Sequence, residues 1–80
     1  MGIKEAVIFR ISELCRDRNI KLNALANLSG VTASTVYSMF DGTRKDVGIV
    51  AVKKLCDGLD ITIIEFFEHA IFRDLEQEIK

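Results

Sequence analysis

The chain contains no proline and no tryptophan, and only one histidine and two cysteines among its 80 residues. No apolar run approaches the roughly 18 residues of a membrane span, and charged residues interrupt the apolar ones near the start. We therefore expect no signal peptide and no membrane contact, and we place the protein in the cytoplasm. Cys15 and Cys56 lie far apart among apolar residues at helical spacing, which favours buried reduced thiols over a disulfide or a metal site.

Neither sign of charge is in strong excess. The sequence has 11 Lys and Arg against 12 Asp and Glu, a net charge of −1, which by itself argues weakly against a nucleic-acid partner. The distribution is uneven: residues 1–46 hold seven basic against five acidic residues, whereas 47–80 hold four against seven. A polyanion would therefore bind the first half. The apolar share of 49% is high for so small a chain and indicates an interface.

Helical periodicity accounts for the whole sequence, because no alternating run is long enough for a strand. The length allows a single domain, residues 1–80, with one core. Apolar residues recur at helical spacing over 3–18, 22–29, 32–40 and 49–58. A fifth helix opens at Thr62, where Thr62 and Glu65 form a capping box. The sequence therefore predicts an all-α fold.

The C-terminal tail shows a further apolar stripe among charged residues. Ile71, Phe72, Leu75 and Ile79 fall at helical spacing, which predicts an added amphipathic helix over 70–80. Little core is left for this stripe, so the helix either folds back on the domain or meets a partner chain. For the second case the sequence predicts a dimer interface of Phe67, Ile71, Phe72, Leu75 and Ile79.

Residues 21–42 have the spacing of two short helices that cross through a tight turn. Ala26 is small where the helices would touch, and Gly30 occupies the turn, where a left-handed backbone costs glycine nothing. A larger side chain at Ala26 would push the helices apart. This segment is the predicted helix-turn-helix.

Two segments of the chain resemble the Xre/Cro-type helix-turn-helix family of phage repressors and bacterial regulators: ISELCRDRNIKLNALANLSGVTASTVYSMFDGTRK and IVAVKKLCDGLDITIIEFF. The resemblance extends from about residue 7 to 67. It implies a five-helix, phage-repressor-like fold that lays the helix starting at Thr32 in the major groove of double-stranded DNA, usually from a homodimer. Leu22 stands where the family often has a phosphate-holding Gln, so Asn23 or the helix N–H groups take that contact. Asp60 stands where the family often has Gly.

The predicted recognition helix, 32–40, turns Val36 and Met39 inward. The outward positions are uncharged and mostly short, and they are the predicted base contacts: Thr32, Ala33, Ser34, Tyr37 and Ser38. Hydroxyl groups read several bases, but this face has no Arg, Asn or Gln for a bidentate base contact. We therefore expect modest discrimination per half-site, supplemented by dimer spacing and DNA shape.

Phosphate contacts need donors beside that helix. The predicted set comprises Lys21, Asn23, Thr43, Arg44 and Lys45. So few cations predict a shallow dependence of affinity on salt.

Other function classes have less support in the sequence. No paired carboxylates, Cys/His arrangement or phosphate-binding glycine loop is present, so we expect neither an enzyme nor a cofactor, metal or small-molecule ligand. The alternative that remains is a protein-interaction module of the same fold, such as an antitoxin or an anti-repressor partner. The weak basic patch and the apolar tail favour that alternative.

Overall fold

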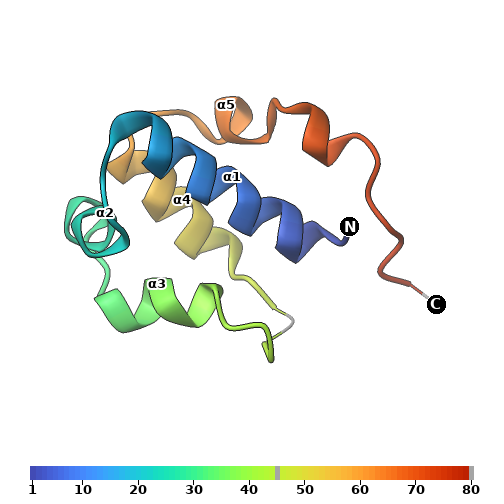
Figure 1. Cartoon of the computed structure of the whole chain (residues 1–80), viewed down its shortest axis with the longest axis horizontal. Helices are drawn as coiled ribbons and strands as arrows, with labels where there is room; N and C mark the ends of the chain where they lie inside the picture. The colour runs from blue at the N-terminus through green and yellow to red at the C-terminus, as the bar shows by residue number, and fades with distance from the viewer. Residues whose placement is uncertain (45, 80) are drawn as a thin grey trace.

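The structure, a computed structural model, describes residues 1–44 and 46–79. Within those residues it contains helices and no strand (Figure 1). The helices are α1 (Ile3–Arg18), α2 (Leu22–Ser29), α3 (Ala33–Met39), α4 (Ile49–Gly58) and α5 (Ile63–Phe67), followed by a 3-10 turn, η1 (Ala70–Phe72). The predicted all-α, five-helix fold is confirmed.

Three helix ends are set by residues with a left-handed backbone. Asn19 ends α1 with φ 54°, Gly30 ends α2 with φ 69°, and Asp60 follows α4 with φ 57°. Asn and Asp tolerate this conformation better than other residues with a side chain, because their short polar groups bond locally. The sequence therefore specifies where each of these three helices stops.

One hydrophobic core is shared by all five helices. Each helix contributes at least one side chain that is fully buried: Ile11, Leu25, Val36, Leu55 and Phe66. The helix α2 packs against both α3 and α4. In Figure 1, α1 and α4 occupy the middle of the view, with α3 below them and α5 above them. This packing fixes α3 at one edge of the molecule, with one side of the helix uncovered.

Arg10 on α1 holds the C-terminal end of α5. Its Nε donates to the Phe66 carbonyl at 2.8 Å, and its Nη2 donates to the Glu65 carbonyl at 3.0 Å. Nη1 pairs with Glu13 Oε1 at 2.8 Å. The last carbonyl groups of a helix have no partner within the helix, so a guanidinium there satisfies several at once. This contact stabilises a helix of only five residues.

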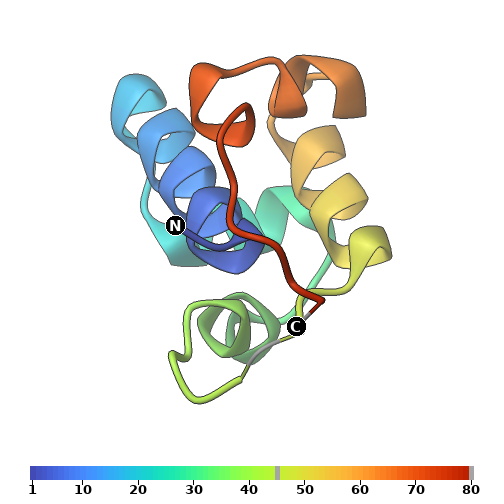
Figure 2. The same cartoon turned by 90° about the vertical axis from the view of Figure 1, so that its right-hand side faces the viewer.

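The predicted helix over 70–80 is wrong. Beyond η1, residues 73–79 form no regular structure. An isolated helix of about ten residues is marginal in water unless its apolar face is packed, and the acidic residues of this segment repel one another. The tail instead runs past the N-terminal end of α1, as Figure 2 shows, where the Glu76 N–H donates to the Met1 carbonyl at 3.0 Å and the Met1 amine pairs with Glu76 Oε1 at 3.1 Å.

Aromatic packing anchors the start of this tail. The rings of Phe67 and Phe72 meet edge to face, with centroids 4.9 Å apart, and Phe66 and Phe67 meet in the same way at 5.0 Å. Phe72 packs against the core. The tail therefore folds back at η1, and most of the expected apolar stripe is used within the chain.

Candidate nucleic-acid interface

The outer face of α3 carries the predicted base contacts. Val36 is fully buried and Met39 nearly so, which turns the opposite side of the helix outward. Thr32, Ser34 and Tyr37 are exposed, whereas Ala33 and Ser38 are partly covered. The side chains predicted for base contact therefore share one face, and none of them is charged.

Thr32 begins α3 as its N-cap. Its Oγ1 accepts a hydrogen bond from the Thr35 N–H at 3.3 Å and lies 2.9 Å from Ser34 Oγ and 3.0 Å from Thr35 Oγ1. These bonds fix the rotamers of the hydroxyls at the start of the helix. Thr32 is thus a structural cap as well as a candidate contact, and Ser34 is the freer hydroxyl of the two.

A hydrogen bond joins α3 to α2 across the turn. The Tyr37 hydroxyl donates to Asn23 Oδ1 at 3.0 Å, and both residues are exposed. The sequence predicted Tyr37 as a base contact and Asn23 as a phosphate contact. The structure brings them into contact.

The N-terminal end of α2 is open. Its N-cap, Lys21, is exposed and its side chain makes no capping hydrogen bond, and the first turn holds no acidic residue. The first N–H groups of a helix lack partners within it and carry partial positive charge, which attracts an anion such as a phosphate. Lys21 and Asn23 therefore lie where a phosphate contact is favourable.

The loop after α3 is organised by Asp41. Its Oδ1 accepts from both the N–H and the hydroxyl of Thr43, at 2.9 and 2.8 Å, and these two bonds hold the pKa of the Asp41 carboxyl below its ordinary value. The Thr43 hydroxyl is therefore already engaged within the loop. Arg44 is exposed, with its Nε 4.0 Å from Asp41 Oδ2. Lys45, the remaining predicted phosphate contact, lies outside the described residues.

Ser38 and Arg44 come together at the other end of α3. Both line a shallow hollow of about 290 Å³ between α3 and the start of α4, which Thr35 and Gly48 also line. Arg44 therefore lies beside the reading face, which is the outer face of α3 with the predicted base contacts. A cation in this position can contact a phosphate while the helix contacts the adjacent base edge.

The sequence also matches the family model of the Cro/C1-type HTH DNA-binding domain over residues 10–70. The chain belongs to this family. The match spans all the surfaces described above, so this Cro/C1-type chain is a DNA-binding regulator and DNA is its partner.

A solved structure shares the fold of this Cro/C1-type domain. It is the crystal structure of the prophage Lp1 protein 11, which is 32% identical and superposes with a TM-score of 0.82, covering 94% of this chain and 100% of that one. No curated protein matches the sequence. Within the described part of this Cro/C1-type chain, no helix is long and apolar enough to cross a bilayer.

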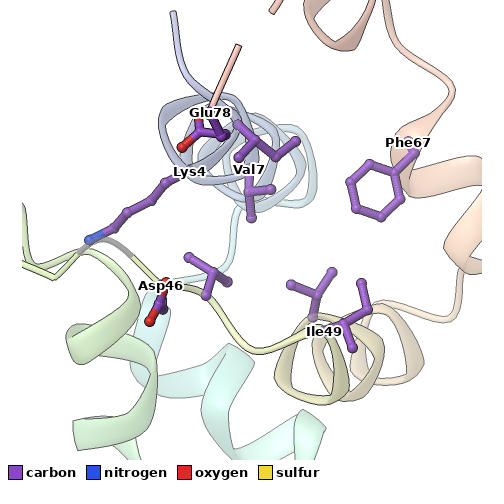
Figure 3. A pocket seen from close by; sticks show the side chains of 9 residues that line it. Lys4, Val7, Asp46, Ile49, Phe67 and Glu78 are labelled. Carbon is purple, nitrogen blue, oxygen red and sulfur yellow. The ribbon is translucent and has the colours of Figure 1, made fainter. Parts of the chain in front are cut away.

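A second surface of the Cro/C1-type domain is apolar. A cleft of about 360 Å³ opens between α1, α4 and α5, and in Figure 3 Val7 and Ile49 approach the same space from two helices while Phe67 lies across from them. Lys4, Asp46 and Glu78 stand at its rim. Phe67 also lines a neighbouring hollow with Ile64.

The predicted dimer residues are divided between the core and the surface. Ile71, Phe72 and Leu75 are partly buried within the chain, and Phe67 is partly buried beside the apolar cleft. Only Ile79 is largely open, with 87% of its surface exposed. Ile49 and Ile64, which the sequence reasoning did not select, are 62% and 74% exposed.

Other residues have roles that the sequence reasoning missed. His69 begins η1 as its N-cap, accepts from the Ile71 N–H through Nδ1 at 3.0 Å and meets Glu13 through Nε2 at 3.2 Å. Hydrogen bonds from Arg10 and then His69 lower the pKa of Glu13. Burial raises the pKa of both cysteine thiols, which are free and buried as expected.

Proposed function

We propose that this chain is a transcriptional repressor that binds its operator as a homodimer and inserts α3 into the major groove. The observation that carries the proposal is the uncovered face of α3, whose short polar side chains let the helix approach the base edges closely. A bound dimer represses by occupying DNA that the transcription machinery needs. We place this action in the cytoplasm, where that DNA is accessible.

The proposed base contacts are Ala33, Ser34, Tyr37 and Ser38, with Thr32 holding the start of the helix. The proposed phosphate contacts are Lys21, Asn23, Arg44 and Lys45, and Thr43 contributes by holding the loop through Asp41. About three cations per subunit correspond to a slope of roughly −5 in a plot of log affinity against log salt for a dimer.

Dimerisation supplies the specificity that one reading face lacks, because hydroxyl contacts discriminate bases less than bidentate ones. We propose that the second copy docks on the exposed apolar surface of Ile49, Ile64 and Phe67. A second copy at this position would cover apolar side chains that are exposed to water in a single chain.

Three experiments test this function. Selection from random-sequence DNA with the full chain should yield a duplex with two related half-sites, and titration against salt should give the slope above. Ile64→Asp should convert a dimer to a monomer in sedimentation and weaken binding to the two-site duplex, whereas Leu28→Asp, an exposed aliphatic residue on α2, should do neither. A monomeric wild-type chain, or no binding at 50 mM salt, contradicts the proposal.

The second candidate function is the protein-interaction module, as in an antitoxin or an anti-repressor partner. The apolar cleft favours it, because a few hundred Å³ of apolar space is enough to receive side chains of another protein. A folded chain that binds no DNA but forms a stoichiometric complex with a protein encoded beside it would replace the first candidate.

A further inference from the structure

The hydroxyl of Tyr37 has a partner within the protein. It donates to Asn23 Oδ1 at 3.0 Å, so the bond runs from the reading face of α3 to the open end of α2. Tyr37 is 52% exposed, so part of its side chain is open for contact with DNA. The hydroxyl proton is therefore already donated within the protein and is not available to a base.

The direction of this hydrogen bond fixes the orientation of the Asn23 amide. Because Oδ1 accepts from Tyr37, the amide nitrogen, with its two N–H donors, is turned away from the tyrosine. The Asn23 nitrogen makes no hydrogen bond to any described residue. Had the hydroxyl accepted from the nitrogen instead, the amide oxygen would be turned outward, and an oxygen repels a phosphate.

The surroundings of Asn23 favour an anion in front of that nitrogen. Asn23 is the second residue of α2, where helix N–H groups lack partners, and the first turn has no acidic residue. Lys21 is exposed two residues earlier.

We propose that Tyr37 is a positioning residue, whose hydroxyl holds the Asn23 amide with its nitrogen facing a DNA phosphate. The inference rests on the proposed DNA-binding function. It links two events: when α3 enters the groove, the same tyrosine presents the phosphate donor of α2. Tyr37 then contributes to affinity for every sequence through its hydroxyl, and to base preference only through its ring.

The test uses the full chain, the duplex that it selects from random-sequence DNA, and a scrambled duplex of equal length. Tyr37→Phe should weaken binding to both duplexes about three- to tenfold, the effect of one lost hydrogen bond. The ratio between the duplexes and the salt slope should not change, because the lost contact is neutral and touches no base. Tyr37→Ala, which also removes the ring, should change the ratio.

A double-mutant cycle separates positioning from a local structural role. In an Asn23→Ala background, Tyr37→Phe should cause no further loss, because the group that it positions is gone. Asn23→Asp keeps the acceptor for Tyr37 but replaces the amide nitrogen with a carboxylate oxygen, so it should bind DNA more weakly than Asn23→Ala. The melting temperatures of these variants should stay within a few degrees of the wild type, because both side chains are exposed.

Several results would overturn this inference. They are equal binding by Tyr37→Phe and the wild type, an altered duplex ratio in Tyr37→Phe, a Tyr37→Phe loss that persists without Asn23, or Asn23→Asp binding as well as Asn23→Ala. In each of these cases the wild type still binds DNA, so the proposed function stands. If the wild type binds neither duplex at 50 mM salt, both proposals fail together.

Discussion

Gly58→Ala tests how closely α2 and α4 approach each other. Gly58 is the last residue of α4 and lies against Ser29, the last residue of α2. A Cβ added to Gly58 would lie 2.3 Å from Ser29 Oγ and 3.0 Å from both the Cα and the N of Ser29. The hydroxyl can rotate away, but the two backbone atoms move only if one helix shifts.

Two opposing contributions set the size of the effect. Alanine is favoured over glycine within a helix by up to about 1 kcal/mol, and by less at its last residue. Overpacking of a close contact costs about 1–3 kcal/mol. Because backbone atoms cause two of the three clashes, we expect the second contribution to dominate and the free energy of unfolding to fall by about 1–2 kcal/mol. For a domain of this size that corresponds to a melting temperature lower by roughly 5–10 °C.

Urea and thermal unfolding of Gly58→Ala, Ser29→Ala and the double variant measure this effect. Ser29 Oγ is buried and bonds to no described group, so Ser29→Ala should be at least as stable as the wild type. The double variant should recover part of the loss, because the backbone contacts at 3.0 Å remain. A Gly58→Ala variant as stable as the wild type would refute this reasoning and show that the helices separate at little cost.

The remaining predictions concern charged side chains. Arg44→Ala should weaken binding to all duplexes alike and reduce the salt slope by about 2 for a dimer, whereas the control Arg16→Ala on α1 should do neither; an altered sequence preference would contradict a phosphate role. Asp41→Asn removes a carboxylate 4.0 Å from Arg44 but keeps an acceptor for the loop, so affinity for any duplex should rise, and a fall would count against the proposal. Arg10→Met should lower the free energy of unfolding in urea by about 1.5–3 kcal/mol, because two carbonyl groups of α5 lose a charged donor; a loss below about 0.5 kcal/mol would disprove the importance of this contact. Folding lowers the pKa of Glu13 below its ordinary 4.5, so the charged carboxylate contributes its full stability above pH 4.5, and this contribution is lost as the pH falls from 4.5 through the lowered pKa. Glu13→Gln should flatten this part of the profile of stability against pH, and an unchanged profile would refute the reasoning.

The sequence predicted those parts of the fold that depend on neighbouring residues. Asn19, Gly30 and Asp60 each adopt a left-handed backbone, a local property that residue type reveals. The inward positions Val36 and Met39 follow from helical periodicity, and both are buried.

The errors concern contacts between distant segments. The stripe of the tail has helical spacing, but whether it forms a helix depends on what packs against it, and Phe72 packs into an aromatic group instead. The role of Arg10 could not be predicted from the sequence, because its partners, the carbonyls of residues 65 and 66, lie 55 and 56 positions away. Spacing within a helix carries no information about such partners.

In the candidate site, too, local features could be predicted from the sequence and contacts between distant segments could not. The outward face of α3 followed from periodicity, but the pairing of Tyr37 with Asn23 depends on the crossing of two helices. The engagement of Thr43 by Asp41 follows from the geometry of the loop. A polar side chain at a β-turn often bonds to the backbone two residues later, so the Asp41–Thr43 spacing was the available signal.

The short side chains on α3 also determine what binding costs in conformational entropy. A lysine or glutamine loses up to about 2 kcal/mol of rotamer freedom when it is immobilised on DNA, whereas alanine loses none and serine little. The hydroxyls of Thr32 and Ser34 are already within hydrogen-bonding distance of each other in the free protein, at 2.9 Å. Such a face is pre-organised, so each weak contact in the proposed complex with DNA would contribute to affinity with little loss to ordering. A single substitution to a longer side chain at Ser34 or Ser38 would extend past its neighbours and change the base sequence that the helix prefers.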